Sequence, residues 1–386
     1  MTPAARVAAA IEVLDDYLSG TPAEQALTGW ARAHRFAGSK DRAAIRDHVF
    51  DALRRLRSSR ALGGGADGRA TMIGLLRGYD IEPDSLFTGE GHAPLPLSTE
   101  ERADVRGLTR AEALDIPDWL IAQIDDSLGA QADEICERLR HRAPVFLRVN
   151  AARTSRDEMQ QALASQGILT RPVQLSPMAL EVTENPRKIN GTIEYQDGLI
   201  ELQDAASQAV IELLDITPGM RVLDFCAGGG GKALAMAARG ADVVAHDIAP
   251  GRMKDLPARA ERAGVRIQCV DGQALKRAGA FDLVLADAPC SGSGSWRRAP
   301  HGKWLLSAQK LDKVLEIQQE ILSQLPNFCA DTGEIAYATC SFLRAENQDQ
   351  VSQFQSANPA WQVLSDRQFT PLDGADGFYV ARLKRK

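Results

Sequence analysis

The sequence predicts an α/β protein with a mostly parallel sheet in its C-terminal half, preceded by a small α+β module and an all-α N-terminal region. From about residue 205 onwards, short apolar strands alternate with helical segments, which is typical of a parallel sheet covered by helices on both faces. Before residue 140, apolar side chains recur at helical spacing instead. We therefore expect three regions, at residues 1–140, 141–204 and 205–386.

The composition is that of a soluble globular protein. The 386 residues are 44% hydrophobic and 25% charged. No apolar run approaches the roughly 18 residues needed to cross a membrane, and acidic residues interrupt the N-terminal apolar stretch within one signal-peptide length. We therefore expect a cytoplasmic protein, with a monomer as the default. The net charge of −6 argues mildly against wholesale nucleic-acid binding but allows a local basic patch.

The first region is expected to be helical and partly basic. One apolar series at helical spacing starts at Val7 and another at Ile45. Glycines at 63–65 and a Pro/Gly-rich stretch at 88–96 predict loops. Residues 32–60 contain nine Lys and Arg against three Asp, which favours a phosphate-contacting surface. The alternative is a solvated helix face with intrahelical ion pairs.

The middle region, residues 141–204, predicts the small α+β module. Residues 145–150 are strand-like, and a polar helix is expected over 155–166. Short β-like pieces follow at 180–183 and 191–193.

Acidic residues follow the strands expected in the third region. Asp247, Asp271 and Asp287 end the second, third and fourth of these strands, which are predicted at 222–225, 243–245, 267–270, 283–286 and 334–337. Because the carboxyl ends of parallel strands form the ligand-binding edge of an open α/β sheet, we expect these acids to line a site. The alternative is that they only cap loops.

A glycine-rich loop follows the first of these strands. It consists of Cys226, Ala227, Gly228, Gly229, Gly230, Gly231 and Lys232. Four glycines let the backbone approach a ligand closely at a helix N-terminus, and Asp247 stands where a doubly wound fold places the acid that binds ribose hydroxyls. Ala233 replaces the Ser or Thr of a P-loop, and no GxGxxG pattern is completed. Adenosylmethionine is therefore the better expected ligand, with NAD as the weaker alternative.

Two cysteines are expected on the same edge of the sheet. Cys290 follows the strand at 283–286, and Cys340 follows the strand at 334–337. Structural cysteines normally lie inside elements, which is the role expected of the other candidates, Cys136, Cys269 and Cys329. No two cysteines have CxxC spacing and the six histidines do not cluster, so we expect no metal site.

Two cysteines, a carboxyl and an adenosylmethionine loop suit methyl transfer to C5 of a cytosine. That carbon is a poor nucleophile until a thiolate adds at C6. A carboxyl at the N3/N4 edge drives the addition, and a base later removes the C5 proton. A thiol with a pKa of about 8.5 is only roughly 3% ionised at pH 7, a handicap of about 2 kcal/mol. We expect the nearby Lys232 to offset part of it.

The chain resembles the RNA (cytosine-5)-methyltransferases of the Nop/Sun group over roughly residues 145–386. The motifs appear in order as Gln203-Asp204-Ala205-Ala206-Ser207, Asp224 to Lys232, Asp247 with Arg252, Asp271, Asp287 to Gly294 and Thr339-Cys340-Ser341. The joint presence of the Pro-Cys and Thr-Cys motifs is highly specific. The resemblance implies a Rossmann-like class I methyltransferase domain over 205–386.

The resemblance also implies a role for each motif residue. Cys340 is implied as the nucleophile and Cys290 as an aid to product release, while Asp287 contacts the target base and lines the cofactor site. The loop 226–232 would hold the methionine part, Asp247 the ribose and Asp271 the adenine side. The family loop usually reads Cys-Ala-Ala-Pro-Gly-Gly-Lys, so Gly228 and Gly229 replace Ala and Pro here. We expect a more flexible loop and weaker cofactor affinity.

The N-terminal regions resemble RNA-binding modules. The segment 36–42 and its helical surroundings are similar to the NusB-type domain of bacterial small-subunit rRNA methyltransferases, and 145–202 resembles the family's ferredoxin-like module. We therefore expect rRNA as the substrate. The alternatives are tRNA with the same chemistry, a non-catalytic RNA-binding assembly factor, and a dinucleotide-dependent oxidoreductase. An aromatic and basic group is expected to contact RNA, or else to form an ordinary helix-entry loop: Trp296, Arg297, Arg298, His301, Lys303 and Trp304.

Overall fold

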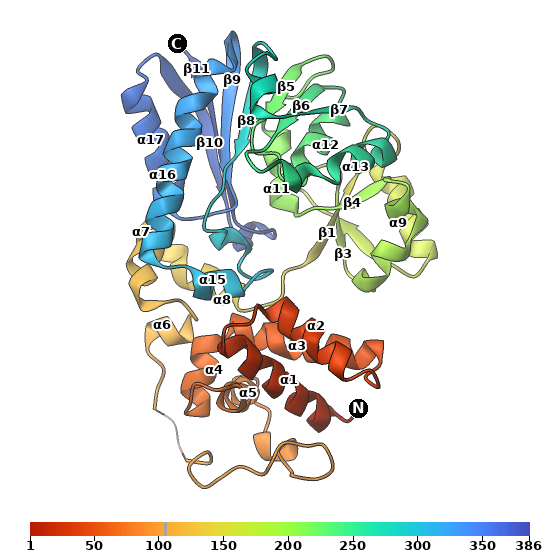
Figure 1. The fold of residues 1–386 in the computed structure, drawn as a ribbon, viewed down its shortest axis with the longest axis vertical. Coiled ribbons are helices and arrows are strands. Elements are labelled where there is room, and N and C mark those ends of the chain that lie inside the picture. Colours follow the sequence, from red (N-terminus) through yellow and green to blue (C-terminus); the bar gives the residue numbers. More distant parts are fainter. Residues whose placement is uncertain (104–105) are drawn as a thin grey trace. The chain divides into compact units, whose positions relative to one another are not determined.

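The computed structural model describes residues 1–103 and 106–386, which form two compact units. The first unit contains Met1–Arg142 together with Trp296–Leu305, and the second contains Ala143–Ser295 and Leu306–Lys386. Figure 1 traces the elements of both units. None of the described helices is long and apolar enough to span a membrane.

The first unit is helical, as expected. Thr2 caps the first helix with its side chain, Pro3 occupies the first helical turn, and Gly64 ends the fourth helix in the left-handed conformation. The apolar residues predicted at helical spacing form one core that includes Val7 and Ile45. The α-helices of this unit are α1 (Pro3–Leu18), α2 (Ala23–Ala33), α3 (Ser39–Arg54), α4 (Leu56–Gly63), α5 (Gly68–Arg77), α6 (Arg110–Ala113), α7 (Ile121–Leu128), α8 (Ala132–Leu139) and α15 (His301–Leu305).

The second unit begins with a four-stranded antiparallel sheet in the order β2-β3-β1-β4. Its elements are β1 (Val145–Val149), α9 (Arg156–Ser165), β2 (Thr170–Pro172), β3 (Ala179–Val182), α10 (Ile193–Gln196) and β4 (Ile200–Leu202). The β-like piece expected at 191–193 is wrong. Residues Pro186–Gly191 form a 3-10 helix, and the Thr192 side chain caps α10 by accepting a hydrogen bond from Tyr195 N.

A seven-stranded sheet follows in the order β10-β11-β9-β8-β5-β6-β7, and it confirms the predicted α/β class. Five strands run parallel, while β11 pairs antiparallel with both β9 and β10 at one edge. The strands are β5 (Arg221–Asp224), β6 (Asp242–His246), β7 (Ile267–Val270), β8 (Phe281–Asp287), β9 (Cys329–Thr339), β10 (Trp361–Phe369) and β11 (Phe378–Arg385).

Helices cover both faces of this sheet because successive strand residues point to opposite sides. Val222 joins one buried cluster with Met236 of α12, and Leu223 joins the other with Phe354 of α17. Figure 1 shows α16 and α17 on one side of the sheet and α11 and α12 on the other. The helices of this part are α11 (Ala205–Glu212), α12 (Gly231–Ala237), α13 (Leu256–Ala263), α14 (Gly272–Leu275), α16 (Ala308–Gln324) and α17 (Gln348–Ala357).

The strand order reverses between β5 and β8. The chain runs outward from β5 through β6 to β7, then returns so that β8 pairs with the other side of β5. Open α/β sheets bind ligands beyond the carboxyl ends of their strands at such a point. The topology therefore directs attention to the loops after β5, β6, β8 and β9.

Candidate active site

The two cysteines predicted to share an edge do meet. Strands β8 and β9 are parallel neighbours in which Asp287 pairs with Ala338, so the loops that follow them start side by side. The Cys290 Sγ and Cys340 Sγ atoms lie 3.3 Å apart, within hydrogen-bonding distance for two thiols. The hydrogen bond to Cys340, together with burial, raises the pKa of Cys290. Cys290 therefore holds its proton at neutral pH.

A buried carboxylate behind the two cysteines was not identified from the sequence. Glu346 is fully buried, and its oxygens accept hydrogen bonds from Ser291 N at 2.7 Å, from both serine hydroxyls, Ser291 Oγ and Ser341 Oγ, and from Gln318 Nε2. Each serine directly follows one of the two cysteines in the chain. Glu346 thus fixes the two cysteine-bearing loops to one another.

Asp287 and Lys232 form an ion pair at the end of β8. The Lys232 Nζ atom lies 2.6 Å from Asp287 Oδ2 and 4.4 Å from the centre of the Phe378 ring. Lys232 is buried, whereas the Asp287 side chain remains 31% exposed. In the structure Lys232 therefore forms an ion pair with a carboxylate, whereas the sequence led us to expect that its charge would stabilise a thiolate. That carboxylate is left accessible to a ligand.

The glycine loop requires glycine at two positions. Gly228 has φ +51° and Gly230 has φ +78°, in the left-handed region that other residues rarely adopt. A Cβ at Gly230 would also lie 2.2 Å from a methyl carbon of Leu256. The substitution of the family's usual Ala by glycine at 228 thus falls where the backbone favours glycine.

Asp247 fastens this loop to the end of β6. Its Oδ2 accepts a hydrogen bond from Gly228 N at 3.0 Å, and its Oδ1 accepts one from Ala249 N at 2.9 Å. Arg252 Nη1 lies 3.2 Å from Asp247 Oδ2. Asp271 caps α14, because its Oδ1 accepts hydrogen bonds from Gln273 N and Ala274 N at the start of that helix.

A second carboxylate, to which the sequence pattern gave no role of its own, lies beneath the loop. Asp224 is the last residue of β5 and is only 1% exposed. Neither of its oxygens forms a well-oriented hydrogen bond among the described residues. Burial and the nearby Asp287 carboxylate raise the pKa of Asp224 to about 7. The Lys232 charge and a backbone hydrogen bond from Ala233 oppose this rise only in part, so the carboxylate suits a ligand that brings a further positive charge.

The aromatic and basic segment expected to contact RNA is largely a packing element. Trp296, Arg297 and Lys303 are buried, so the expectation of RNA contact is wrong for these three. Within the first unit, the carbonyl of Arg297 accepts a hydrogen bond from Arg54 Nε at 2.7 Å. Burial lowers the pKa of Lys303 to about 8, against the opposing effect of Asp115. The charged residues near Lys303 are distant from it in the chain, so the local sequence does not indicate that Lys303 is buried.

Comparison with known proteins adds two matching family models. The model described as 16S rRNA methyltransferase RsmB/F matches residues 211–384, and a ferredoxin-like domain of RsmF/B-type methyltransferases matches residues 116–189.

The chain is also similar to a curated protein and to solved structures. Ribosomal RNA small subunit methyltransferase B of Photorhabdus laumondii is 32% identical over 285 residues, which are 70% of this chain and 66% of that protein. The crystal structure of PH0851 superposes on 100% of this chain and 99% of that chain, with TM-score 0.78 and 20% identity. A methyltransferase homolog from Pyrococcus horikoshii covers 72% of this chain and 98% of its own, with TM-score 0.63 and 23% identity. The two structural likenesses concern the fold alone.

Proposed function

Because the chain belongs to the RsmB/F family of methyltransferases, we propose that it transfers a methyl group from S-adenosylmethionine to C5 of a cytosine in small-subunit rRNA. The observation that carries this proposal is the pair of thiols 3.3 Å apart at the ends of β8 and β9. The chain spans 66% of the length of the curated relative. Methyl transfer to most other acceptors requires no thiol, whereas the C5 reaction requires one to add and later leave.

We assign the attack on C6 to Cys340 and the release step to Cys290. Cys340 attacks as the thiolate after its proton passes to solvent; its sulfur forms a bond to C6, and the ring gains the electron pair that later lets C5 take the methyl group. Asp287 is 31% exposed and can meet the amino edge of the base, and the Lys232 ammonium, 2.6 Å from Asp287 Oδ2, offsets the negative charge that addition places on the ring. A solvent water then removes the C5 proton as base, and the electrons of that C–H bond form the C5–C6 double bond while the C6–sulfur bond breaks. Cys290 retains a proton 3.3 Å from the departing sulfur, where it can protonate it.

The residues present fit adenosylmethionine. When bound, this cofactor supplies an electrophilic methyl group on a sulfonium. The Asp224 carboxylate, buried without a well-formed partner among the described residues, is positioned for the ammonium of the methionine part. The glycine loop leaves no room for a Cβ at Gly230, so backbone forms this wall of the cradle. We assign the ribose to Asp247 and the adenine side to Asp271, as the family motif implies.

Methyl transfer to isolated RNA tests this proposal. The purified protein is incubated with S-adenosylmethionine and either small-subunit rRNA or tRNA, and the RNA is digested to nucleosides for mass spectrometry. We expect 5-methylcytidine in the rRNA sample and none with the Cys340→Ser variant. A methyl group on another base or atom would contradict the chemistry, and 5-methylcytidine only in tRNA would contradict the substrate. RNA binding without any transfer would favour an assembly factor.

A further inference from the structure

The basic stretch at residues 32–60 divides into two parts in the structure. Toward its C-terminal end, Arg54 and Arg55 are buried and Arg57 pairs with Asp118. Toward its N-terminal end the cations are exposed: Arg32, Arg35, Lys40 and Arg42. None of these four has a carboxylate within ion-pair distance among residues 1–103 and 106–386. The N-terminal part therefore offers positive charge that is both exposed and without an ion pair among the described residues.

The acidic residues near this part are already occupied. Asp41 is bonded by Arg6, which holds the pKa of that carboxyl below its usual range. Glu24 receives two hydrogen bonds from Arg46. Neither carboxylate thus neutralises the four exposed cations.

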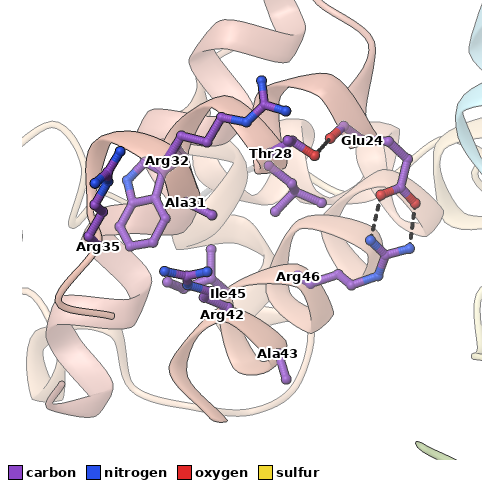
Figure 2. Close-up of a pocket in the computed structure, with 11 residues that line it drawn as sticks. Glu24, Thr28, Ala31, Arg32, Arg35, Arg42, Ala43, Ile45 and Arg46 are labelled. Atoms are coloured by element: carbon purple, nitrogen blue, oxygen red, sulfur yellow. Dashed lines mark hydrogen bonds and ion pairs between the residues drawn. The ribbon is translucent and has the colours of Figure 1, made fainter. Parts of the chain in front are cut away.

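A pocket of about 480 Å³ lies between α2 and α3 beside these cations. Ligand pockets commonly have volumes of about 300–1,000 Å³. Figure 2 shows Arg35 and Arg42 toward one end of the pocket and the Glu24–Arg46 pair at the opposite end, with the Arg32 side chain extending along the upper edge between them. Arg42 is held in place because its Nε donates to Ala37 O at 2.9 Å. Three of the residues that line the pocket are therefore exposed arginines outside that ion pair.

An aromatic row leads out of the same pocket. The Trp30 ring, which lines the pocket, stacks on His34 with ring centres 4.3 Å apart, and the Phe36 ring meets His34 edge-on at 5.8 Å. Phe36 is 75% exposed. A large apolar ring left in water beside arginines is the usual arrangement of a surface that stacks unpaired bases and binds the adjacent phosphates.

We propose that the α2–α3 pocket binds an unpaired segment of RNA. Arg32, Arg35 and Arg42 contact consecutive phosphates, and a base stacks on Phe36. This inference rests on the proposed RNA substrate and deepens it, because it places an anchoring site in the helical unit, outside the methyl-transfer site. A duplex could contact the cations through its phosphates but has no unpaired base to stack on Phe36. We therefore assign a single-stranded occupant.

Binding of a fluorescein-labelled 16-nucleotide single-stranded RNA of mixed sequence to the full-length protein tests the site. Fluorescence anisotropy gives Kd at several salt concentrations. The Arg32→Gln/Arg35→Gln variant should raise Kd about 10-fold and reduce the slope of log Kd against log salt by about 1.4, or about 0.7 for each lost phosphate contact. Phe36→Ala should raise Kd at least about 5-fold, and Phe36→Tyr should retain wild-type affinity because its ring still stacks.

The matched control removes two exposed arginines elsewhere in the same unit. Arg102 and Arg138 are about half exposed, and their double substitution by Gln should leave Kd and the salt slope within twofold of wild type. Equal losses in this control and in the pocket variant would overturn the proposal, as would an unchanged slope in the pocket variant. A Phe36→Ala variant with full affinity, or an equal loss of affinity for a 16-base-pair duplex, would overturn the single-strand assignment.

Methyl transfer separates this proposal from the proposed function. At saturating RNA, the Arg32→Gln/Arg35→Gln variant should retain the wild-type kcat and show a raised KM. A wild-type protein that binds RNA through the pocket but transfers no methyl group would refute only the proposed function. Full transfer with unaltered RNA affinity in the pocket variants would refute only the pocket.

Discussion

Replacing Asp224 by Asn should stabilise the free protein and weaken its binding of adenosylmethionine. Asp224 is 1% exposed, its oxygens have no well-formed hydrogen bond among the described residues, and its pKa is raised to about 7. An unfolded Asp has a pKa of about 3.9. The folded state therefore holds this proton more tightly, and stability is lost as the pH rises from about 4 to about 7.

The magnitude follows from the difference of about three pKa units. At about 1.4 kcal/mol per unit, ionised Asp224 costs about 4 kcal/mol above pH 7, as an upper bound. Asn has nearly the same shape and no charge at any pH. At about 2–4 °C for each kcal/mol, the Asp224→Asn variant should unfold several degrees higher than wild type at pH 8. The gain should fall to about half a kcal/mol near pH 4, where Asp224 is protonated in the folded state and about half protonated in the unfolded state.

Thermal unfolding between pH 4 and pH 8.5 and calorimetric titration with adenosylmethionine measure the two effects. The expected loss of affinity is about 10-fold or more, because a buried charge-assisted bond to the ligand ammonium disappears. The control Asp242→Asn, at a 68% exposed side chain, should change neither quantity appreciably. A variant that is less stable than wild type at pH 8, or a stability difference that does not depend on pH, would refute this reasoning.

Two further substitutions test the rest of the site. Glu346→Ala should lower kcat more than 10-fold while adenosylmethionine affinity stays unchanged, because only the two cysteine loops lose their common anchor; an unchanged kcat in single-turnover assays would contradict that role. Gly230→Ala should destabilise the protein by about 1–3 kcal/mol in urea unfolding, because its Cβ would meet Leu256 at 2.2 Å with φ at +78°. The control Gly229→Ala should be nearly neutral, because the only atom within 4 Å of its Cβ would be Arg259 Nη1, at 3.4 Å. Similar losses of stability for both substitutions would contradict the steric argument.

The parallel strands were predictable because the apolar runs of most of them are short, buried and bounded by glycine or acid, whereas β7, which was also predicted, is largely exposed. The antiparallel edge was not predicted strand by strand. In β10, exposed polar side chains occupy most positions between Trp361 and Phe369, so no apolar run marks the strand. Its pairing with β11 is a long-range property that local pattern does not contain.

The cysteines and the glycine loop were predictable because their chemistry depends on residue type and position in a motif. The roles of Asp224 and Glu346 depend instead on burial and on partners from other loops. For Lys303 the sequence predicted a functional contact that the structure does not allow. This basic residue beside aromatics was expected at an RNA surface, yet it lies fully buried near Asp115. Sequence pattern identifies which groups are present, and packing decides which of them reach a ligand.

The proposed reaction depends on a covalent bond between Cys340 and C6 of the target cytosine. The most direct measurement uses the Cys290→Ala protein with adenosylmethionine and small-subunit rRNA, followed by denaturing electrophoresis. We predict a protein–RNA adduct that survives denaturation and is absent from Cys290→Ala/Cys340→Ala. The adduct should persist in Cys290→Ala/Cys269→Ala, whose second change removes an exposed cysteine of β7. An adduct that remains without Cys340, or methyl transfer by the Cys340→Ala protein, would contradict the proposed reaction.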